Sequence, residues 1–330
     1  MDSIDFASFL EQYSFKDEWR IEHKESGMNN TTRMVTAGNE RFVMRIYNNH
    51  KDSGIVALEH EILDWLQTKA LPFQVPLPIH NGNGTTLTRI EDGTIASLFR
   101  YIEGERADAA TERHVYLLGR AAGELSAALS DARPSRQPLY SPYYELEETY
   151  AAMDEESFIN LSERSNELLA RRESMTRLMN ERRYLKPLSI RIAELPKQWI
   201  HGDLVFNNTL VRDGAISGVL DFEFCTVDVR AMELAVTAVD MIRPGRGDLL
   251  DRIKLLFAGY SEVIRLSDRE MELLPAMMKL RLLDVALHFA IRFKDGLDAD
   301  EVLCGIIDQS VYGCEWVERH ADGLLRQLRA

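Results

Sequence analysis

The sequence predicts an α+β protein in which strands fill much of the first hundred residues and helices most of the rest. Two regions, 19–47 and 85–101, contain short apolar runs bounded by turn residues, the pattern of strands. From about residue 111 onward, apolar residues recur mainly at the spacing of amphipathic helices. The chain has 330 residues, 45% of them hydrophobic, which is enough to bury a sizeable core. Strands followed by helices are typical of the α+β class.

The stretch 199–223 joins a polar loop to a hairpin and carries the side chains that indicate a chemistry. An Asp-Gly pair between two apolar runs is a strong hairpin signal. We expect the hairpin to bring the residues that follow it back toward the polar loop. In order, the stretch contains an apolar entry, the loop with His201, Asp203 and Asn208, an apolar run at 209–211, the Asp-Gly pair at 213–214, a second run at 216–220, and Asp221.

Phosphoryl transfer needs this set of side chains, because the transferring group is stabilised by positioning and charge neutralisation. One carboxylate must orient the attacking hydroxyl, and an amide and a second carboxylate must hold the magnesium ion that bridges the phosphates. Protein kinases carry H-R-D-x-x-x-x-N followed by D-F-G. Here the same residue types stand in the same order, with Glu223 in place of the glycine: His201, Asp203, Asn208, Asp221 and Phe222. Five such identities would arise by chance in roughly one chain in ten thousand, which argues against an unrelated solvated loop.

The patterns I-H-G-D-L-x-x-x-N-x-L-V and G-V-L-D-F-E resemble the family of aminoglycoside phosphotransferases, choline kinases and type II homoserine kinases. The resemblance implies a protein-kinase-like fold, with a small N-terminal lobe of antiparallel sheet and one helix, a hinge, a large helical C-terminal lobe, and ATP between the lobes. It implies Asp203 as the catalytic base, and Asn208 and Asp221 as magnesium ligands. His201 would brace the loop rather than act as a nucleophile.

The N-terminal lobe is predicted to begin with a short helix over residues 2–12, whose apolar face holds Phe6, Phe9 and Leu10. Strands are expected at 19–23, 31–37 and 41–47.

Residues 25–30, between the first two of these strands, contain one glycine and taken alone indicate a hairpin turn. The resemblance to the family implies that this segment corresponds to the loop that covers the nucleotide phosphates. Its backbone N–H groups and short polar side chains would then meet phosphate oxygens. The candidates are Ser26, Gly27, Asn29 and Asn30.

The third strand places Arg45 where the resemblance expects a phosphate-binding lysine. A guanidinium can also bind phosphates, in bidentate fashion. Because side chains alternate along a strand, Val43 and Arg45 should share one face and Met44 the opposite one. The resemblance implies that the face with Val43 and Arg45 meets the nucleotide. The following helix, expected over 54–69, carries Glu59, and the resemblance predicts an ion pair between Glu59 and Arg45. The alternative is that Glu59 is a solvated helix residue.

Prolines after this helix indicate an extended connection, and strands are expected at 85–89 and 95–101. The second strand ends F-R-Y-I-E-G-E, which resembles the hinge of the family. Backbone groups of Arg100, Tyr101 and Ile102 would bond the adenine edge. We therefore expect a nucleotide-binding lobe over residues 1–101 and a catalytic, acceptor-binding lobe over 102–330.

The second lobe is predicted to be mostly helical. Residues 141–185 are highly charged and read as two helices that either form a wall of the acceptor cleft or decorate the lobe. Glu233 lies in a Glu-Leu-Ala sequence, where the resemblance implies a carboxylate that braces the catalytic loop. Further helices are expected at 115–129, 228–240, 247–264, 268–293 and 299–328.

Polar residues recur at helical spacing within the helix at 268–293: Arg281, Asp284, His288 and Arg292. They either line a stripe that faces the acceptor or form a solvated helix face, and we favour the solvated face.

The net charge of −14 argues against nonspecific binding to nucleic acid or to an anionic membrane, and weakly favours a cationic acceptor. Cys225, Cys304 and Cys314 are odd in number and lack metal-type spacing, so we expect buried, reduced thiols. No signal peptide or membrane-length apolar run is visible, and a cytoplasmic location is expected.

The sequence thus predicts an ATP- and magnesium-dependent kinase that phosphorylates a hydroxyl of a small metabolite, a homoserine- or choline-like amino alcohol. An aminoglycoside antibiotic kinase is one alternative. A non-catalytic nucleotide-binding protein of kinase descent is another, which Arg45 and the missing glycines favour. Retention of Asp203, Asn208 and Asp221 together argues against it.

Overall fold

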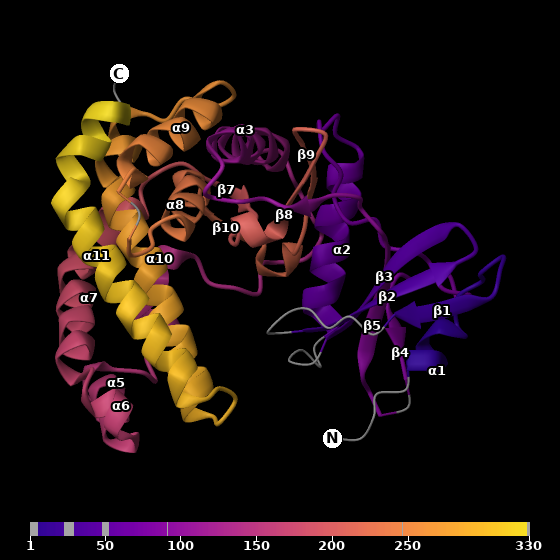
Figure 1. The fold of residues 1–330 in the computed structure, drawn as a ribbon, viewed down its shortest axis with the longest axis horizontal. Helices are drawn as coiled ribbons and strands as arrows, with labels where there is room; N and C mark the ends of the chain where they lie inside the picture. The colour runs from indigo at the N-terminus through magenta and orange to yellow at the C-terminus, as the bar shows by residue number, and fades with distance from the viewer. Residues whose placement is uncertain (1–5, 23–29, 48–52, 91, 246, 329–330) are drawn as a thin grey trace. The chain divides into compact units, whose positions relative to one another are not determined.

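The computed structural model describes residues 6–22, 30–47, 53–90, 92–245 and 247–328. The chain divides into two compact units (Figure 1). The first, here called the N-terminal unit, comprises residues 1–105, 132–139 and 210–223. The second, here called the helical unit, comprises residues 106–131, 140–209 and 224–330.

The N-terminal unit is built on an antiparallel sheet with the strand order β1-β2-β3-β5-β4. Its strands are β1 (Trp19–Glu22), β2 (Asn30–Ala37), β3 (Glu40–Tyr47), β4 (Thr88–Arg89) and β5 (Ile95–Arg100). The β2–β3 turn needs a glycine, because Gly38 has a φ of 59° and an added Cβ would lie 2.2 Å from Asp17 Oδ2. The antiparallel sheet predicted for this part of the chain is therefore confirmed.

One face of this sheet carries the core of the unit. Helix α1 (Phe6–Leu10) packs Phe9 and Leu10, both fully buried, against Met44, Ile46 and Leu98. The expected alternation of β3 is confirmed, because Met44 is buried while Val43 and Arg45 are only partly buried. Helix α2 (Ser53–Gln67) also belongs to this unit.

A hairpin of β8 (Thr209–Arg212) and β9 (Ala215–Val219) follows the polar loop, as predicted. Both turn residues, Asp213 and Gly214, have positive φ, as a type I′ turn requires. The strand β6 (Glu105–Arg106) pairs with β8. Gln74 anchors β9, since its N–H donates to Ser217 O and its carbonyl accepts from Val219 N, each at 3.0 Å. The segment that leads to Asp221 is thus fixed within the N-terminal unit.

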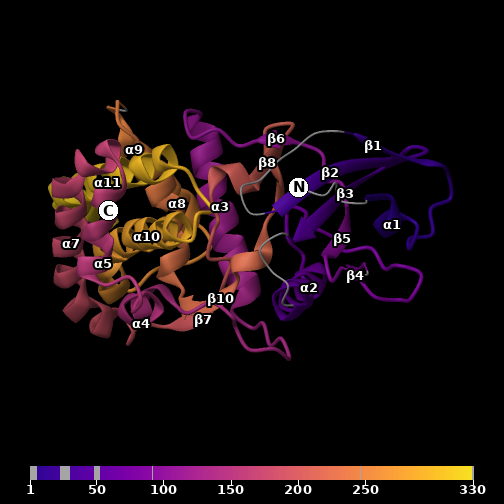
Figure 2. The same cartoon turned by 90° about the horizontal axis from the view of Figure 1, so that it is seen from below.

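The helical unit contains a short antiparallel ribbon of β7 (Lys197–Ile200) and β10 (Thr226–Val229). Its longer helices are α3 (Glu112–Leu129), α7 (Arg172–Ile192), α8 (Ala231–Asp240), α9 (Leu249–Ser261), α10 (Asp268–Lys294) and α11 (Asp300–Leu328). Helix α10 packs beside both α8 and α11 (Figure 1, Figure 2). The α+β class is confirmed, and no helix in the described ranges combines the length and apolar character needed to cross a bilayer.

Two helix predictions in this unit are wrong in detail. Residues 226–229 form β10, so the helix expected from residue 228 begins at Ala231. Short helices precede α7 where two helices were expected, because Asp154 and Ser165 act as N-caps whose side chains accept from backbone N–H groups and start new turns. These short elements are η1 (Tyr143–Glu145), α4 (Leu146–Thr149), α5 (Glu155–Asn160), η2 (Leu161–Arg164) and α6 (Asn166–Leu169).

The three cysteines, Cys225, Cys304 and Cys314, are buried thiols, as expected.

Candidate active-site residues

One face of α8 holds the polar loop that follows β7. Positions 233, 237 and 240 lie on the same side of the helix because they are four and three residues apart. The bonds are His201 N to Glu233 Oε2 at 2.5 Å, Thr237 Oγ1 to Leu204 O at 2.8 Å, and Phe206 N to Asp240 Oδ2 at 3.0 Å. The loop is therefore fixed along its length by one rigid element.

Glu233 and His201 make the contacts of bracing residues. Both side chains are fully buried, and His201 Nδ1 accepts from Asp203 N at 3.2 Å. Burial raises the pKa of Glu233 to about 7, although the N–H groups of His201 and Gly202 lower it. The predicted bracing contact of Glu233 with the loop is confirmed.

Gly202 gives the loop a backbone conformation that few other residues adopt. Its φ is 78°, and an added Cβ would lie 2.7 Å from Phe224 O. A side chain at this position would strain the turn that carries Asp203.

Asp203 and Asn208 contact each other within the helical unit. Asn208 Nδ2 donates to Asp203 Oδ2 and to Asp203 O, both at 3.0 Å. The spacing of five residues that the sequence pattern singles out thus places the amide beside the carboxylate. The side chain of Asp203 is 20% exposed, so it remains accessible to a small molecule.

Arg281 of α10 forms an ion pair with Asp203. Its Nη1 donates to the hydroxyl oxygen of Tyr143 at 2.7 Å, and the same hydroxyl donates to Gly202 O at 2.7 Å. Sequence reasoning missed Tyr143, because no motif or spacing links residue 143 to the loop; only the tertiary fold brings them together.

Asp284 and Tyr150 extend this network. Asp284 Oδ2 lies 3.8 Å from Arg281 Nη1, and Tyr150 donates to Asp284 Oδ1 at 2.7 Å. Burial raises the pKa of Asp284, and Arg281 and Tyr150 lower it. Burial alone would lower the pKa of Arg281, but Tyr143, Asp203 and Asp284 together raise it above its usual range.

The preference for a solvated helix face is wrong for this part of α10. Arg281 and Asp284 are only 17% and 22% exposed, and Arg281 pairs with the loop carboxylate of Asp203. Arg292, about two helical turns beyond Asp284, instead pairs with Asp298 at 2.7 Å. The polar residues that recur along α10 therefore do not form one stripe: Arg281 and Asp284 belong to the network around Asp203, and Arg292 belongs to a separate ion pair with Asp298.

In the N-terminal unit, Arg45 of β3 lies among carboxylates. The predicted ion pair with Glu59 is confirmed, with Nη1 3.0 Å from Oε1. Arg45 also pairs with Glu223, at 3.1 Å, and with Asp221. Tyr47 donates to Glu59 Oε2 at 3.0 Å. Sequence reasoning assigned one carboxylate to this arginine and missed the others, because Asp221 and Glu223 reach it only through the hairpin.

This cluster carries more negative than positive charge. The side chains of Glu59 and Glu223 are each 1% exposed, and that of Asp221 is 31% exposed. Burial raises the pKa of Glu59 to about 7, although Arg45 lowers it. Glu223 Oε1 is buried without a hydrogen-bond partner. A divalent cation would offset this excess, so the residues fit a magnesium ion held at Asp221.

Asp221 has a φ of 69°, a conformation that non-glycine residues seldom adopt and that recurs at functional sites. In the described ranges, no group of at least three carboxylate, imidazole or thiolate residues forms a ready-made metal site. Magnesium is compatible with this, because it is commonly held by one or two carboxylates together with substrate phosphates and water.

Of the phosphate-loop candidates, Ser26, Gly27 and Asn29 lie outside the described residues. Asn30 opens β2, is 6% exposed, and donates to Glu223 Oε2 at 2.8 Å. Its amide nitrogen therefore supports the carboxylate cluster.

In the predicted adenine-binding segment, two backbone N–H groups already donate hydrogen bonds within the protein. Arg100 N donates to Leu77 O and Tyr101 N donates to Arg41 O, both at 3.0 Å. These two backbone N–H groups are therefore not available to a ligand.

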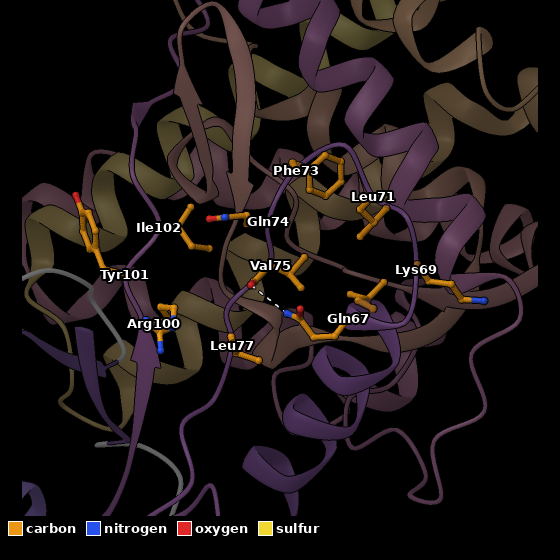
Figure 3. Close-up of a pocket in the computed structure, with 11 residues that line it drawn as sticks. Gln67, Lys69, Leu71, Phe73, Gln74, Val75, Leu77, Arg100, Tyr101 and Ile102 are labelled. Carbon is orange, nitrogen blue, oxygen red and sulfur yellow. Dashed lines mark hydrogen bonds between the residues drawn. The ribbon is translucent and has the colours of Figure 1, made fainter. Parts of the chain in front are cut away.

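Figure 3 shows that Arg100, Tyr101 and Ile102 line a pocket of about 280 Å³ with the end of α2 and the connection after it. Gln67 closes one side of this pocket by donating to Val75 O at 3.4 Å. The cluster around Arg45 does not line it, so the pocket is separate from the proposed phosphate site.

Several solved kinases have folds similar to that of this chain. A microcompartment-associated aminopropanol kinase has a TM-score of 0.66 at 18% identity, covering 96% of this chain and 97% of the other. The amicoumacin kinase hAmiN, in complex with AMP-PNP, Ca²⁺ and amicoumacin, has a TM-score of 0.69 at 15% identity, covering 93% of each chain. Choline kinase from Cryptosporidium parvum has a TM-score of 0.62 at 13% identity, covering 93% and 91%.

The chain belongs to the phosphotransferase enzyme family, whose model matches residues 21–266. Its relatives include homoserine kinases. That of Methylocella silvestris is 24% identical over 288 residues, covering 87% of this chain and 84% of the relative. That of Acidiphilium cryptum is 25% identical over 277 residues, covering 83% and 81%. The protein is thus a homoserine kinase-like small-molecule phosphotransferase, which confirms the predicted enzyme class.

Proposed function

We propose that the protein transfers the terminal phosphoryl group of ATP, bound with magnesium, to the hydroxyl of a small amino alcohol of the homoserine or choline type. The observation that carries the proposal is the loop clamped by α8, in which Asn208 holds Asp203 at 3.0 Å. A kinase needs a carboxylate fixed in this manner, because orientation of the hydroxyl supplies much of the catalysis.

Asp203 is proposed to accept a hydrogen bond from the acceptor hydroxyl and to take its proton as the oxygen attacks phosphorus. The bracing by His201 and Glu233 keeps Asp203 from rotating away, so that little orientational entropy is lost in the transition state. The amide of Asn208 fixes one carboxylate oxygen of Asp203.

Asn208 and Asp221 are proposed to hold the magnesium ion, which when bound neutralises phosphate charge. Arg45 would hold phosphate oxygens through its guanidinium. Its ion pairs with Glu59 and Glu223 orient the guanidinium and prevent an unpaired buried cation. Residues 1–101 would form the nucleotide-binding lobe and residues 102–330 the catalytic lobe.

Arg100, Tyr101 and Ile102 are proposed to bound the adenine. Nucleotide use receives support from the relative solved with AMP-PNP and from an aminoglycoside phosphotransferase solved with ADP and hygromycin B, with a TM-score of 0.61 at 15% identity.

Nucleotide consumption measured over a panel of acceptors tests the proposal. The panel is homoserine, choline, ethanolamine, common sugars and aminoglycosides, each with and without magnesium. We expect magnesium-dependent consumption with an amino alcohol, lowered roughly 10²–10⁴-fold by Asp203→Asn. Fastest turnover with an aminoglycoside would favour the antibiotic-kinase alternative, and no acceptor-dependent turnover would reject the proposal.

A further inference from the structure

The ion pair between Arg281 and Asp203 is not needed to orient a hydroxyl. A cation bound to a general base lowers the affinity of that base for a proton, and so works against proton removal. A buried arginine also costs desolvation free energy unless its partners compensate. We therefore expect Arg281 to have a function in addition to its contact with Asp203.

The surroundings of Arg281 form a built site. Tyr143 accepts from its Nη1 at 2.7 Å and is itself fixed by Gly202 O at 2.7 Å. Asp284 lies 3.8 Å from the same nitrogen and is oriented by Tyr150 at 2.7 Å. All of these side chains belong to the helical unit.

This cluster contains both a positively charged and a negatively charged side chain. Arg281 offers a planar fork of N–H donors, which matches the two oxygens of a carboxylate. Asp284 offers a carboxylate that an ammonium group can approach, since 22% of its side chain is exposed. Because Arg281 touches Asp203, an acceptor whose hydroxyl lies on Asp203 would place a nearby anionic group on Arg281.

We propose that Arg281 binds a carboxylate of the acceptor and that Asp284 faces its ammonium group, so that the acceptor is a short zwitterionic hydroxy amino acid. This inference rests on the proposed function and narrows its acceptor class. Choline has no anionic group and would bring a permanent positive charge toward Arg281, which disfavours it.

Two truncations of homoserine separate these contacts. 3-Amino-1-propanol is homoserine without its carboxylate, and 4-hydroxybutyrate is homoserine without its ammonium. A site built to bond a charged group rejects an analogue that lacks it, because the buried partner is left unpaired. We expect wild-type kcat/KM for homoserine to exceed that for either analogue by roughly 10- to 150-fold, the range for hydrogen bonds to charged groups.

Substitutions should remove these preferences one at a time. Arg281→Met should abolish the preference for homoserine over 3-amino-1-propanol, chiefly through KM for homoserine, and Arg281→Lys should retain part of it. Asp284→Asn should weaken the preference for homoserine over 4-hydroxybutyrate. Arg191→Met is the matched control, because Arg191 pairs with Glu272 of α10 at 2.8 Å while 46% exposed, and it should leave all ratios unchanged.

Several results would overturn the inference. If Arg281→Met lowers kcat/KM for homoserine and 3-amino-1-propanol by the same factor, Arg281 only positions Asp203. If wild type uses choline or 3-amino-1-propanol as well as homoserine, the acceptor class is wrong while the proposed kinase function stands. If no acceptor supports turnover, the proposed function fails first. If Arg281→Met does not fold, the substrate preferences of Arg281→Lys still test the role of Arg281.

Discussion

Replacing Arg45 by methionine tests the charge balance of the N-terminal unit. The substitution leaves Glu59 and Glu223, each 1% exposed, without their cation. Removal of one partner from a buried ion pair typically costs 3–5 kcal/mol, so we expect the free energy of unfolding to fall by about 3–5 kcal/mol at pH 8. Methionine keeps much of the volume of the side chain, so lost packing adds little.

The loss caused by Arg45→Met should depend on pH. Burial raises the pKa of Glu59 to about 7 even with Arg45 present, and without Arg45 the pKa rises further. The folded variant then binds more protons than the unfolded chain between pH 6 and 8, so its stability falls as pH rises. The cost of the substitution should therefore be smaller at pH 6 than at pH 8.

Urea unfolding followed by tryptophan fluorescence at both pH values measures this effect. Arg41→Met is the control, because Arg41 lies on the same strand and pairs with Glu103 at 2.9 Å, with the two side chains 45% and 50% exposed. Its removal should cost at most about 1 kcal/mol. A cycle with Glu59→Gln should show a coupling of about 0.5–3 kcal/mol. A loss for Arg45→Met no larger than that of the control, or one that does not shrink at pH 6, would refute the reasoning.

Two further predictions concern the helical unit. Glu233 has a pKa raised from 4.5 to about 7, so its folded form binds the proton more tightly and wild-type stability should fall as pH rises through this range. Glu233→Gln should remove roughly 2 kcal/mol of this pH dependence, measured by urea unfolding at pH 5 and 7.5, and an unchanged slope would contradict the assignment. Gly119→Ala should cost about 1–3 kcal/mol, because its Cβ would lie 2.0 Å from Leu256 O where α3 meets α9. Gly305→Ala, with no atom within 4 Å of its Cβ, should instead gain up to about 1 kcal/mol, and equal thermal shifts for the two alanines would contradict the close helix contact.

Local features of the sequence predicted much of the fold. The Asp-Gly pair predicted the hairpin, because the positive φ of both turn residues is a local requirement. The alternation of β3 predicted the face on which Arg45 lies, and the next helix offered Glu59 as its partner. These contacts arise between neighbouring elements, which is why periodicity reveals them.

Contacts across long sequence separations could not be predicted in this manner. Arg281 reaches Asp203 over 78 residues, and Arg45 reaches Asp221 over 176. Nothing in the α10 pattern distinguishes Arg281 from a solvated arginine, since both occur at the same helical spacing. The division of residues 141–185 into several short helices could not be predicted either, because the N-caps that start new helices there are single polar residues among many.

The proposed kinase activity depends most on distinct roles for Asp203 and Asp221, and calorimetric titration with magnesium-ATP tests these roles directly. Asp203→Asn should bind the nucleotide with nearly wild-type affinity while turnover falls roughly 10²–10⁴-fold. Asp221→Asn should bind it more weakly, because a proposed metal ligand is lost. Wild-type nucleotide affinity in the Asp221 variant with magnesium present, or undiminished turnover in the Asp203 variant, would contradict the assignment of base and metal ligand.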